Sequence, residues 1–153
     1  MRRLGLSGDA ADEVTQETFL RAWRGIGRFE GEARFGTWLY RIGFNEAKRR
    51  LQRERPRALL VSLDDDGTGE LADLREEPHC RAAHSELQQA LAGSVRGLSL
   101  KHRAPLILRD IEGLSTAEAA AVLGLSESAL KSRLHRARVA VRDALDGHLD
   151  GGH

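Results

Sequence analysis

The chain has 153 residues, of which 41% are hydrophobic and 31% charged, a composition that excludes a wholly disordered chain. Its net charge of +1 hides an uneven distribution: residues 1–57 carry 13 basic and 8 acidic groups, residues 58–90 carry 2 and 8, and residues 91–153 carry 9 and 7. The single Cys80 excludes an internal disulfide, and no apolar run resembles a signal peptide or a membrane span, so we expect a cytoplasmic location.

The first third of the chain predicts two helices. Residues 9–24 contain no Gly or Pro and place their apolar side chains at helical spacing. After a loop at 28–33, a second periodic run predicts a helix over 35–53, whose later half is strongly basic. The period favours core positions for three apolar residues of this run, Phe35, Trp38 and Ile42. Tyr40 lies off that stripe and is the better candidate for an aromatic ligand contact.

Residues 58–80 are predicted to be a linker, because acidic side chains and glycines interrupt the helical spacing there. Potential metal ligands follow at its end and just beyond it, namely His79, Cys80 and His84. Since no second cluster of ligands accompanies them, the polar start of the next helix is the preferred interpretation, and no metal site is predicted.

Two further helices are predicted after the linker. The first follows from the spacing of Leu87, Leu91 and Val95, and it ends at Gly97. The second covers residues 100–111, with Ser99 as its N-terminal cap, a kink at Pro105 and a stop at Gly113.

Residues 116–144 predict a helix-turn-helix. The preceding Ser115 opens the capping box Ser-Thr-Ala-Glu, and Gly124 supplies the backbone freedom that the turn between the two helices needs. The second helix, capped by Ser126, is predicted over 127–145. One apolar stripe follows it, made of Leu130, Leu134, Ala137, Val141 and Leu145.

The opposite face of this second helix is basic, since no acidic residue occurs between Ala129 and Arg142. Such a helix can approach DNA phosphates while side chains near its start reach base edges. A solvated basic face is the alternative. The cap, the glycine turn and the apolar stripe together favour DNA binding.

Two stretches resemble extracytoplasmic-function (ECF) sigma factors of bacterial RNA polymerase. The run 103–138, which contains LRDIEGLS and LKSRLHRAR, resembles their region 4, and residues 16–23 (QETFLRAW) with 37–51 look like their domain 2. The resemblance implies an all-α protein with two small helical domains joined by an acidic linker. The expected bounds are 1–57 for the sigma domain 2-like part, 58–80 for the linker, 81–147 for the domain 4-like helix-turn-helix and 148–153 for a tail.

The resemblance implies a subunit that directs promoter-specific initiation through minus-35 and minus-10 recognition and promoter melting. No nucleophile-base arrangement, phosphate-binding glycine loop or pair of carboxylates stands out in the sequence, so no catalytic activity and no cofactor are predicted. Its partners would be core RNA polymerase, promoter DNA and, as a further candidate, an anti-sigma factor. The acidic linker would be either a solvated tether or a strand that passes through the basic RNA path of the polymerase.

The implied site residues form three groups. Minus-35 contacts are assigned to Glu127, Ser128, Lys131, Ser132, Arg133, Arg136 and Arg138. Minus-10 contacts are assigned to Tyr40, Arg41, Asn45, Lys48, Arg49 and Arg53. Polymerase contacts are assigned to Glu13, Gln16, Glu17 and Arg21.

Members of this family have at least one more helix before the segment that corresponds to 16–23. We therefore expect this chain to be shortened at its N-terminus and its apolar face around Val14, Phe19 and Trp23 to be partly uncovered. Domain 2 would then be less stable than domain 4 unless a partner covers it. Two other functions stay open: a stand-alone helix-turn-helix regulator that dimerises on a palindrome, and, more distantly, a metalloenzyme.

Overall fold

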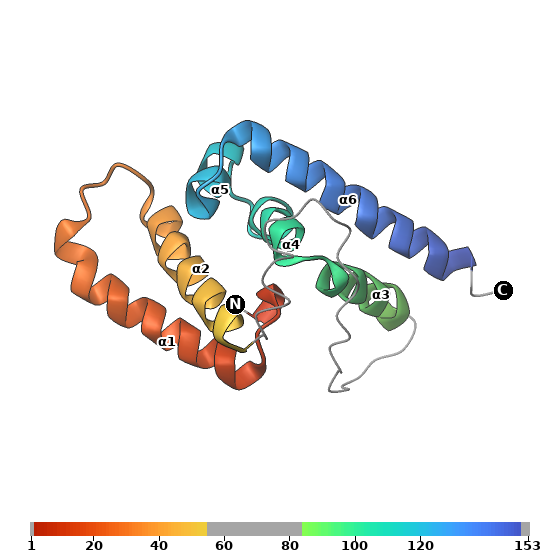
Figure 1. The fold of residues 1–153 in the computed structure, drawn as a ribbon, viewed down its shortest axis with the longest axis horizontal. Helices are drawn as coiled ribbons and strands as arrows, with labels where there is room; N and C mark the ends of the chain where they lie inside the picture. The colour runs from red at the N-terminus through yellow and green to blue at the C-terminus, as the bar shows by residue number, and fades with distance from the viewer. Residues whose placement is uncertain (1, 55–83, 151–153) are drawn as a thin grey trace.

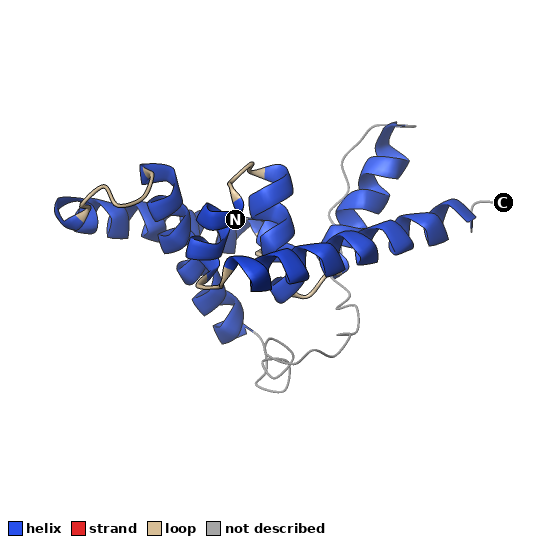
Figure 2. Ribbon diagram, turned by 90° about the horizontal axis from the view of Figure 1, so that it is seen from above, coloured by secondary structure: helices blue, strands red, loops and turns tan. Residues whose placement is uncertain are grey.

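The computed structural model describes residues 2–54 and 84–150, so the expected linker, His79 and Cys80 lie outside the described residues. Within these two ranges the chain is helical with short connecting loops and contains no strand (Figure 2), which confirms the predicted all-α fold. In the same ranges, no helix combines the length and the apolar character that a bilayer crossing demands.

Two long helices form the N-terminal part. A short 3-10 turn, η1 (Arg2–Leu4), precedes α1 (Gly8–Gly25), whose first turn is capped by the Ser7 hydroxyl, which accepts from the Ala10 N–H at 3.4 Å. A second 3-10 turn, η2 (Ile26–Arg28), leads through a loop to α2 (Phe35–Glu54). The two helices pack side by side (Figure 1). Their bounds agree with the predicted ones to within about one residue at each end.

The buried face of α2 differs from the expected one. Its buried residues are Thr37, Gly43, Ala47 and Leu51, whereas Phe35 is 49% exposed and Trp38 and Ile42 are half-buried. The prediction of core positions for these last three residues is therefore wrong. The helical period is compatible with either face, and packing against α1 and the C-terminal helices selects the stripe with the smaller side chains.

Three aromatic residues form a separate cluster beside the loop between the two helices. The rings of Phe29, Phe35 and Trp38 have centroids 5.1 to 5.9 Å apart, in tilted and edge-on arrangements. Such geometry is favourable for aromatic pairs. The cluster stiffens the connection between η2 and α2 and leaves Phe35 accessible to a partner.

The C-terminal part begins with α3 (His84–Gly97) and α4 (Leu100–Leu106). Ser99 stands at the N-terminal cap position of α4, but its hydroxyl lies 3.2 Å from His102 Nδ1 and caps no backbone N–H, contrary to expectation. The predicted single helix over 100–111 changes after Leu106 into a π-helical segment, η5 (Ile107–Ile111). Glu112 N–H donates to the Ile107 carbonyl at 2.9 Å, and this wider turn takes the place of a simple proline kink.

The helix-turn-helix is formed by α5 (Thr116–Leu123) and α6 (Glu127–Asp150). Both halves of the predicted capping box are present, since Ser115 Oγ accepts from Glu118 N–H and the Glu118 carboxylate accepts from Ser115 N–H. Gly124 ends α5 with a φ of 66°, in the left-handed region that glycine favours. The predicted turn is confirmed, and α6 extends five residues beyond its expected end at residue 145.

The N-terminal and C-terminal parts share one hydrophobic cluster, while the buried residues of two further clusters belong to the C-terminal part alone. Leu4, Leu6, Ala10, Ala11 and Val14 are buried in one cluster with Ala47 and Leu51 of α2 and with Leu100, Ala104 and Ile107. A second cluster buries Leu130 among residues of η5 and α5, with Tyr40 and Phe44 of α2 packed against it. Val14, expected to be uncovered, is only 5% exposed, whereas Phe19 and Trp23 are 59% and 79% exposed, as predicted.

Candidate polymerase and DNA interfaces

The start of α6 presents the cationic face that the sequence assigns to the minus-35 element. Leu130, Leu134 and Ala137 anchor one side of the helix in the core. On the other side Glu127, Ser128, Lys131, Ser132 and Arg136 are exposed, while Arg133 is half-buried. A helix held in this way can enter a groove of DNA without losing its packing.

Arg138, the last residue of the minus-35 group, is held by an ion pair within the protein. Its Nη2 and Nε atoms donate to the two carboxylate oxygens of Asp110 at 2.6 and 2.9 Å. The Arg138 side chain thereby lowers the pKa of Asp110, and the pKa of Arg138 is raised in return. Arg138 joins α6 to η5, so a phosphate contact by this residue would compete with Asp110.

The minus-10 group occupies one side of α2. Arg41, Asn45, Lys48 and Arg49 follow the i, i+4, i+7, i+8 spacing of a single helical face, and all four are exposed, as is Arg53 one turn further on. Arg49 Nη1 donates to Glu46 Oε1 at 3.0 Å, so one cation of this face is already paired.

Tyr40 lies apart from the other minus-10 residues and contacts the C-terminal part. Its hydroxyl donates to Glu112 Oε2 at 2.6 Å, and the ring packs against the core cluster around Leu130. The hydrogen bond to Glu112, with a smaller contribution from burial, raises the pKa of Tyr40 to about 12. Glu112 also pairs with Arg3 at 3.3 Å, and Arg34 pairs with Glu118 at 3.6 Å, so a line of polar contacts joins the two parts.

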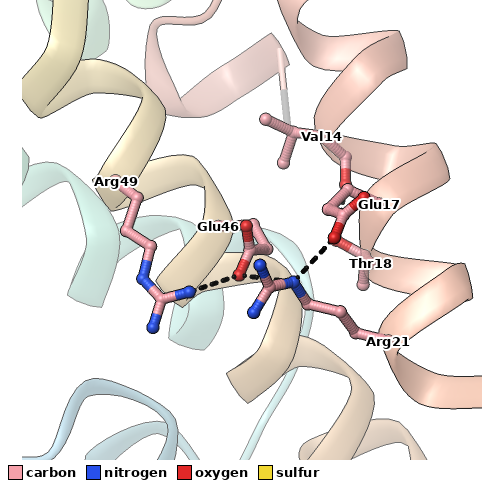
Figure 3. A network of polar contacts seen from close by, with 6 residues as sticks. All are labelled: Val14, Glu17, Thr18, Arg21, Glu46 and Arg49. Atoms are coloured by element: carbon pink, nitrogen blue, oxygen red, sulfur yellow. Dashed lines mark hydrogen bonds and ion pairs between the residues drawn. The ribbon is translucent and has the colours of Figure 1, made fainter. Parts of the chain in front are cut away.

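The residues assigned to polymerase lie along α1, and three of them already have polar partners in the structure. Glu13 accepts from Arg50 of α2 at 2.7 Å, whereas Gln16 is exposed. Arg21 Nε lies 2.9 Å from Glu17 Oε1 and 3.0 Å from Glu46 Oε1 of α2 (Figure 3). Beside them Phe19, Leu20 and Trp23 form an exposed apolar ridge.

One residue from each of the two groups assigned to DNA lines a cleft of roughly 390 Å³ between α2, α4 and the helix-turn-helix. Lys48 of the minus-10 group and Arg133 of the minus-35 group both line this cleft, together with Lys101. In this arrangement the two groups are parts of one compact body.

Three polar residues that shape these surfaces were missed by the sequence analysis: Glu46, Asp110 and Glu112. Asp110 and Glu112 stand within the LRDIEGLS run, but their partners are 28 and 72 residues away. Only the i, i+3 spacing of Glu46 and Arg49 was visible in the sequence. Among the described residues no group of His, Cys, Asp and Glu has the arrangement of a metal site, and the side chain of His84 is not among those described.

Comparisons with known proteins agree with these features. The Sigma-70 region 2 model matches residues 1–57, and the Sigma-70 region 4 model matches residues 88–141. The chain is 36% identical to the RNA polymerase sigma-H factor of Pseudomonas aeruginosa over 88% of this chain and 72% of that protein. It is 35% identical to the ECF RNA polymerase sigma-E factor of Escherichia coli K12 over 88% and 73% of the two chains.

Solved structures show the same architecture. CnrH in complex with the cytosolic domain of CnrY has a TM-score of 0.66 and 32% identity, covering 95% of this chain and 77% of that one. RpoE of Bartonella quintana in complex with the anti-sigma factor NepR has a TM-score of 0.68 and 26% identity, covering 94% and 86%.

The chain belongs to the extracytoplasmic-function family of RNA polymerase sigma factors. It has a region 2 and a region 4, and its role is in transcription initiation. We use these two region names below for residues 1–57 and 88–141.

Proposed function

We propose that α6 reads the minus-35 promoter element and that α2 reads the minus-10 element and helps to hold it open. The observation that supports this most directly is the α5–α6 helix-turn-helix, whose exposed cationic face begins at the N-terminus of α6, opposite buried Leu130 and Leu134. Exposed Arg41, Asn45, Lys48 and Arg53 give α2 polar and cationic contacts for a separated strand.

Core RNA polymerase is the proposed partner of α1, through Gln16, Glu17 and the exposed ridge beside them. An anti-sigma factor is a second proposed partner, because two similar solved structures are named as complexes with CnrY and with NepR. We further propose that the protein works in the cytoplasm as an initiation factor without catalytic activity of its own.

Promoter binding requires the two regions to separate. The minus-35 and minus-10 elements are about 25 base pairs apart, which is about 85 Å at about 3.4 Å per base pair. Lys48 and Arg133 line one cleft of roughly 390 Å³, so the arrangement described here cannot serve both elements at once. The described form is therefore a closed state, and the promoter-bound form is an open one.

The deciding experiment is transcription in vitro with purified core polymerase and a library of promoters. We expect specific transcripts to depend on added protein and to share two elements with a fixed spacing. If the protein binds a palindromic site and starts no transcript with core polymerase, it is a stand-alone regulator and the proposal is wrong.

A further inference from the structure

Glu46 connects the polymerase-facing helix to the DNA-facing helix. It lies on α2, and its side chain is 12% exposed, less than any other residue in its network. Glu46 Oε1 is 3.0 Å from Arg21 Nε on α1 and 3.0 Å from Arg49 Nη1 one turn along α2 (Figure 3). One carboxylate therefore binds two arginines that have been assigned to different partners.

The surroundings of this carboxylate are rich in cations. A cleft of roughly 610 Å³ between α1 and α2 is lined by Glu46 together with Arg21, Asn45 and Arg49. Arg24 and Arg28 also line it, so the wall is rich in cations that a nucleic-acid backbone would attract. Within this lining the carboxylates are Glu17, which pairs with Arg21, and Glu46.

We propose that Glu46 limits sequence-independent DNA binding by neutralising Arg49 and fixing its position. Backbone phosphates attract every free cation equally and carry no sequence information. A carboxylate beside Arg49 repels those phosphates, so DNA is retained only when base contacts elsewhere add to the binding. Arg21 acts as the positioning residue for Glu46, because it holds the carboxylate from the neighbouring helix.

This inference rests on the proposed role of α2 in binding DNA, and it predicts that removing the charge makes the protein bind every DNA sequence more tightly. Glu46→Gln keeps the size of the side chain and removes the negative charge that offsets the Arg49 cation. Each additional phosphate bound by the protein steepens the dependence of log K on log salt by about 0.7 for single-stranded DNA. Lowering the salt from about 200 to about 50 mM should therefore raise the affinity of Glu46→Gln about threefold more than that of the wild type.

The test measures binding of the full chain to a fluorescent oligothymidylate across a salt series. Glu54→Gln is the matched control, because Glu54 is on the same helix and pairs at 2.6 Å with Arg50, a cation outside the proposed DNA contacts. We expect the steeper slope in Glu46→Gln and little change in Glu54→Gln. In Glu46→Gln/Arg49→Ala the increase in affinity should disappear, which a purely structural role of Glu46 would not produce.

A second measurement compares holoenzymes on promoter DNA and on non-promoter DNA of equal length. Both affinities should rise by the same factor in Glu46→Gln, because a phosphate contact strengthens binding to every sequence alike, and both should stay at the wild-type value in Glu54→Gln. Equal salt slopes in wild type and Glu46→Gln, in a protein that still directs transcription, would overturn this inference alone. Absence of promoter-dependent transcription by the wild type would instead overturn the proposed function.

Discussion

Individual side chains on α6 differ in what they already contact, and this separates their expected roles in DNA binding. Lys131 is exposed and Arg133 lines the interdomain cleft, whereas Arg138 is held by Asp110. Replacing Lys131 or Arg133 by Ala should weaken minus-35 binding by about 1 to 3 kcal/mol where a base contact is lost. Anisotropy on promoter and scrambled duplexes measures this, with Arg142→Ala, an exposed cation further along α6, as the control.

Arg138→Ala should behave differently from these two variants. If Arg138 contacts a phosphate, this variant should bind all DNA sequences more weakly by the same factor and with a flatter dependence on salt. Because the ion pair of Arg138 with Asp110 is half-exposed, its loss should also lower the free energy of unfolding by only about 0.2 to 1 kcal/mol.

Unchanged promoter selection in both Lys131→Ala and Arg133→Ala would refute the assignment of the minus-35 face.

Gly5 lies where the N-terminal segment packs closely against Arg103 of α4. Its φ is +97°, and an added Cβ would lie 2.5 Å from Nη1 of Arg103, whose side chain is buried. Gly5→Ala should therefore lower the free energy of unfolding by about 1 to 3 kcal/mol. In Gly93→Ala, where nothing lies within 4 Å of the new Cβ inside α3, stability should instead rise by about 0.5 to 1 kcal/mol. Urea denaturation of the two variants measures both changes, and equal effects would contradict the prediction.

Among the helices, α5 depends most clearly on its cap. It has eight residues, and its first turn is closed by the reciprocal bonds between Ser115 and Glu118. Ser115→Ala should lower the free energy of unfolding by about 0.5 to 2 kcal/mol, measured by chemical denaturation. Ser128→Ala is a suitable control, since Ser128 is exposed in the first turn of α6, whose N-terminal cap is Ser126. Equal losses in both variants would contradict the role of the cap.

The cap also adds a pH dependence to the stability of α5. The Ser115 N–H that donates to Glu118 lowers the pKa of this carboxyl below its usual range. The ionised form is thus favoured by folding, so its contribution is fully present above about pH 4.3, the ordinary pKa of Glu, and is lost as pH falls through the lower, folded pKa. The stability difference between wild type and Glu118→Gln should shrink over that acid range.

The local elements were predictable from the sequence because their signals are local. The capping box, Gly124 and the apolar stripe of α6 lie close together in the sequence, and the structure confirms the cap, the turn and the burial of Leu130, Leu134 and Ala137. The buried face of α2 was not predictable, since the period of a helix does not say which of its faces meets a neighbour. Packing between distant segments creates the ion pair of Glu46 with Arg21 and the hydrogen bond of Tyr40 with Glu112. No local sequence pattern predicts such contacts.

At the scale of the whole molecule, the contact between Tyr40 and Glu112 indicates whether the protein is in the closed state, in which regions 2 and 4 are packed together. Tyr40 is the single tyrosine of the chain, so tyrosinate absorbance measures this residue alone. Its pKa is raised to about 12, which means that the contact stabilises the closed state below about pH 10, the ordinary pKa of Tyr, and is lost as pH rises through about 12. In Glu112→Ala the pKa should return toward about 10.

The same titration can follow opening. At a fixed pH of about 11, the closed protein should show little tyrosinate, and a state with separated regions should show much more. A pKa near the ordinary value in the wild type would mean that the closed state is not the main form in solution. Glu54→Gln, which changes the charge far from Tyr40 on the same helix, should leave the titration unchanged.

The hydrophobic core shared by regions 2 and 4 has a consequence for engineered transcription systems. Leu4, Leu6 and Ala10 touch the same cluster as Leu100, Ala104 and Ile107, so exchanging region 4 between two such proteins replaces one half of a fitted surface. A chimera of that kind would lose close packing even if its new helix-turn-helix still bound DNA. To keep the closed state, such a chimera would need the buried residues of this shared cluster to be transferred together with the recognition helix.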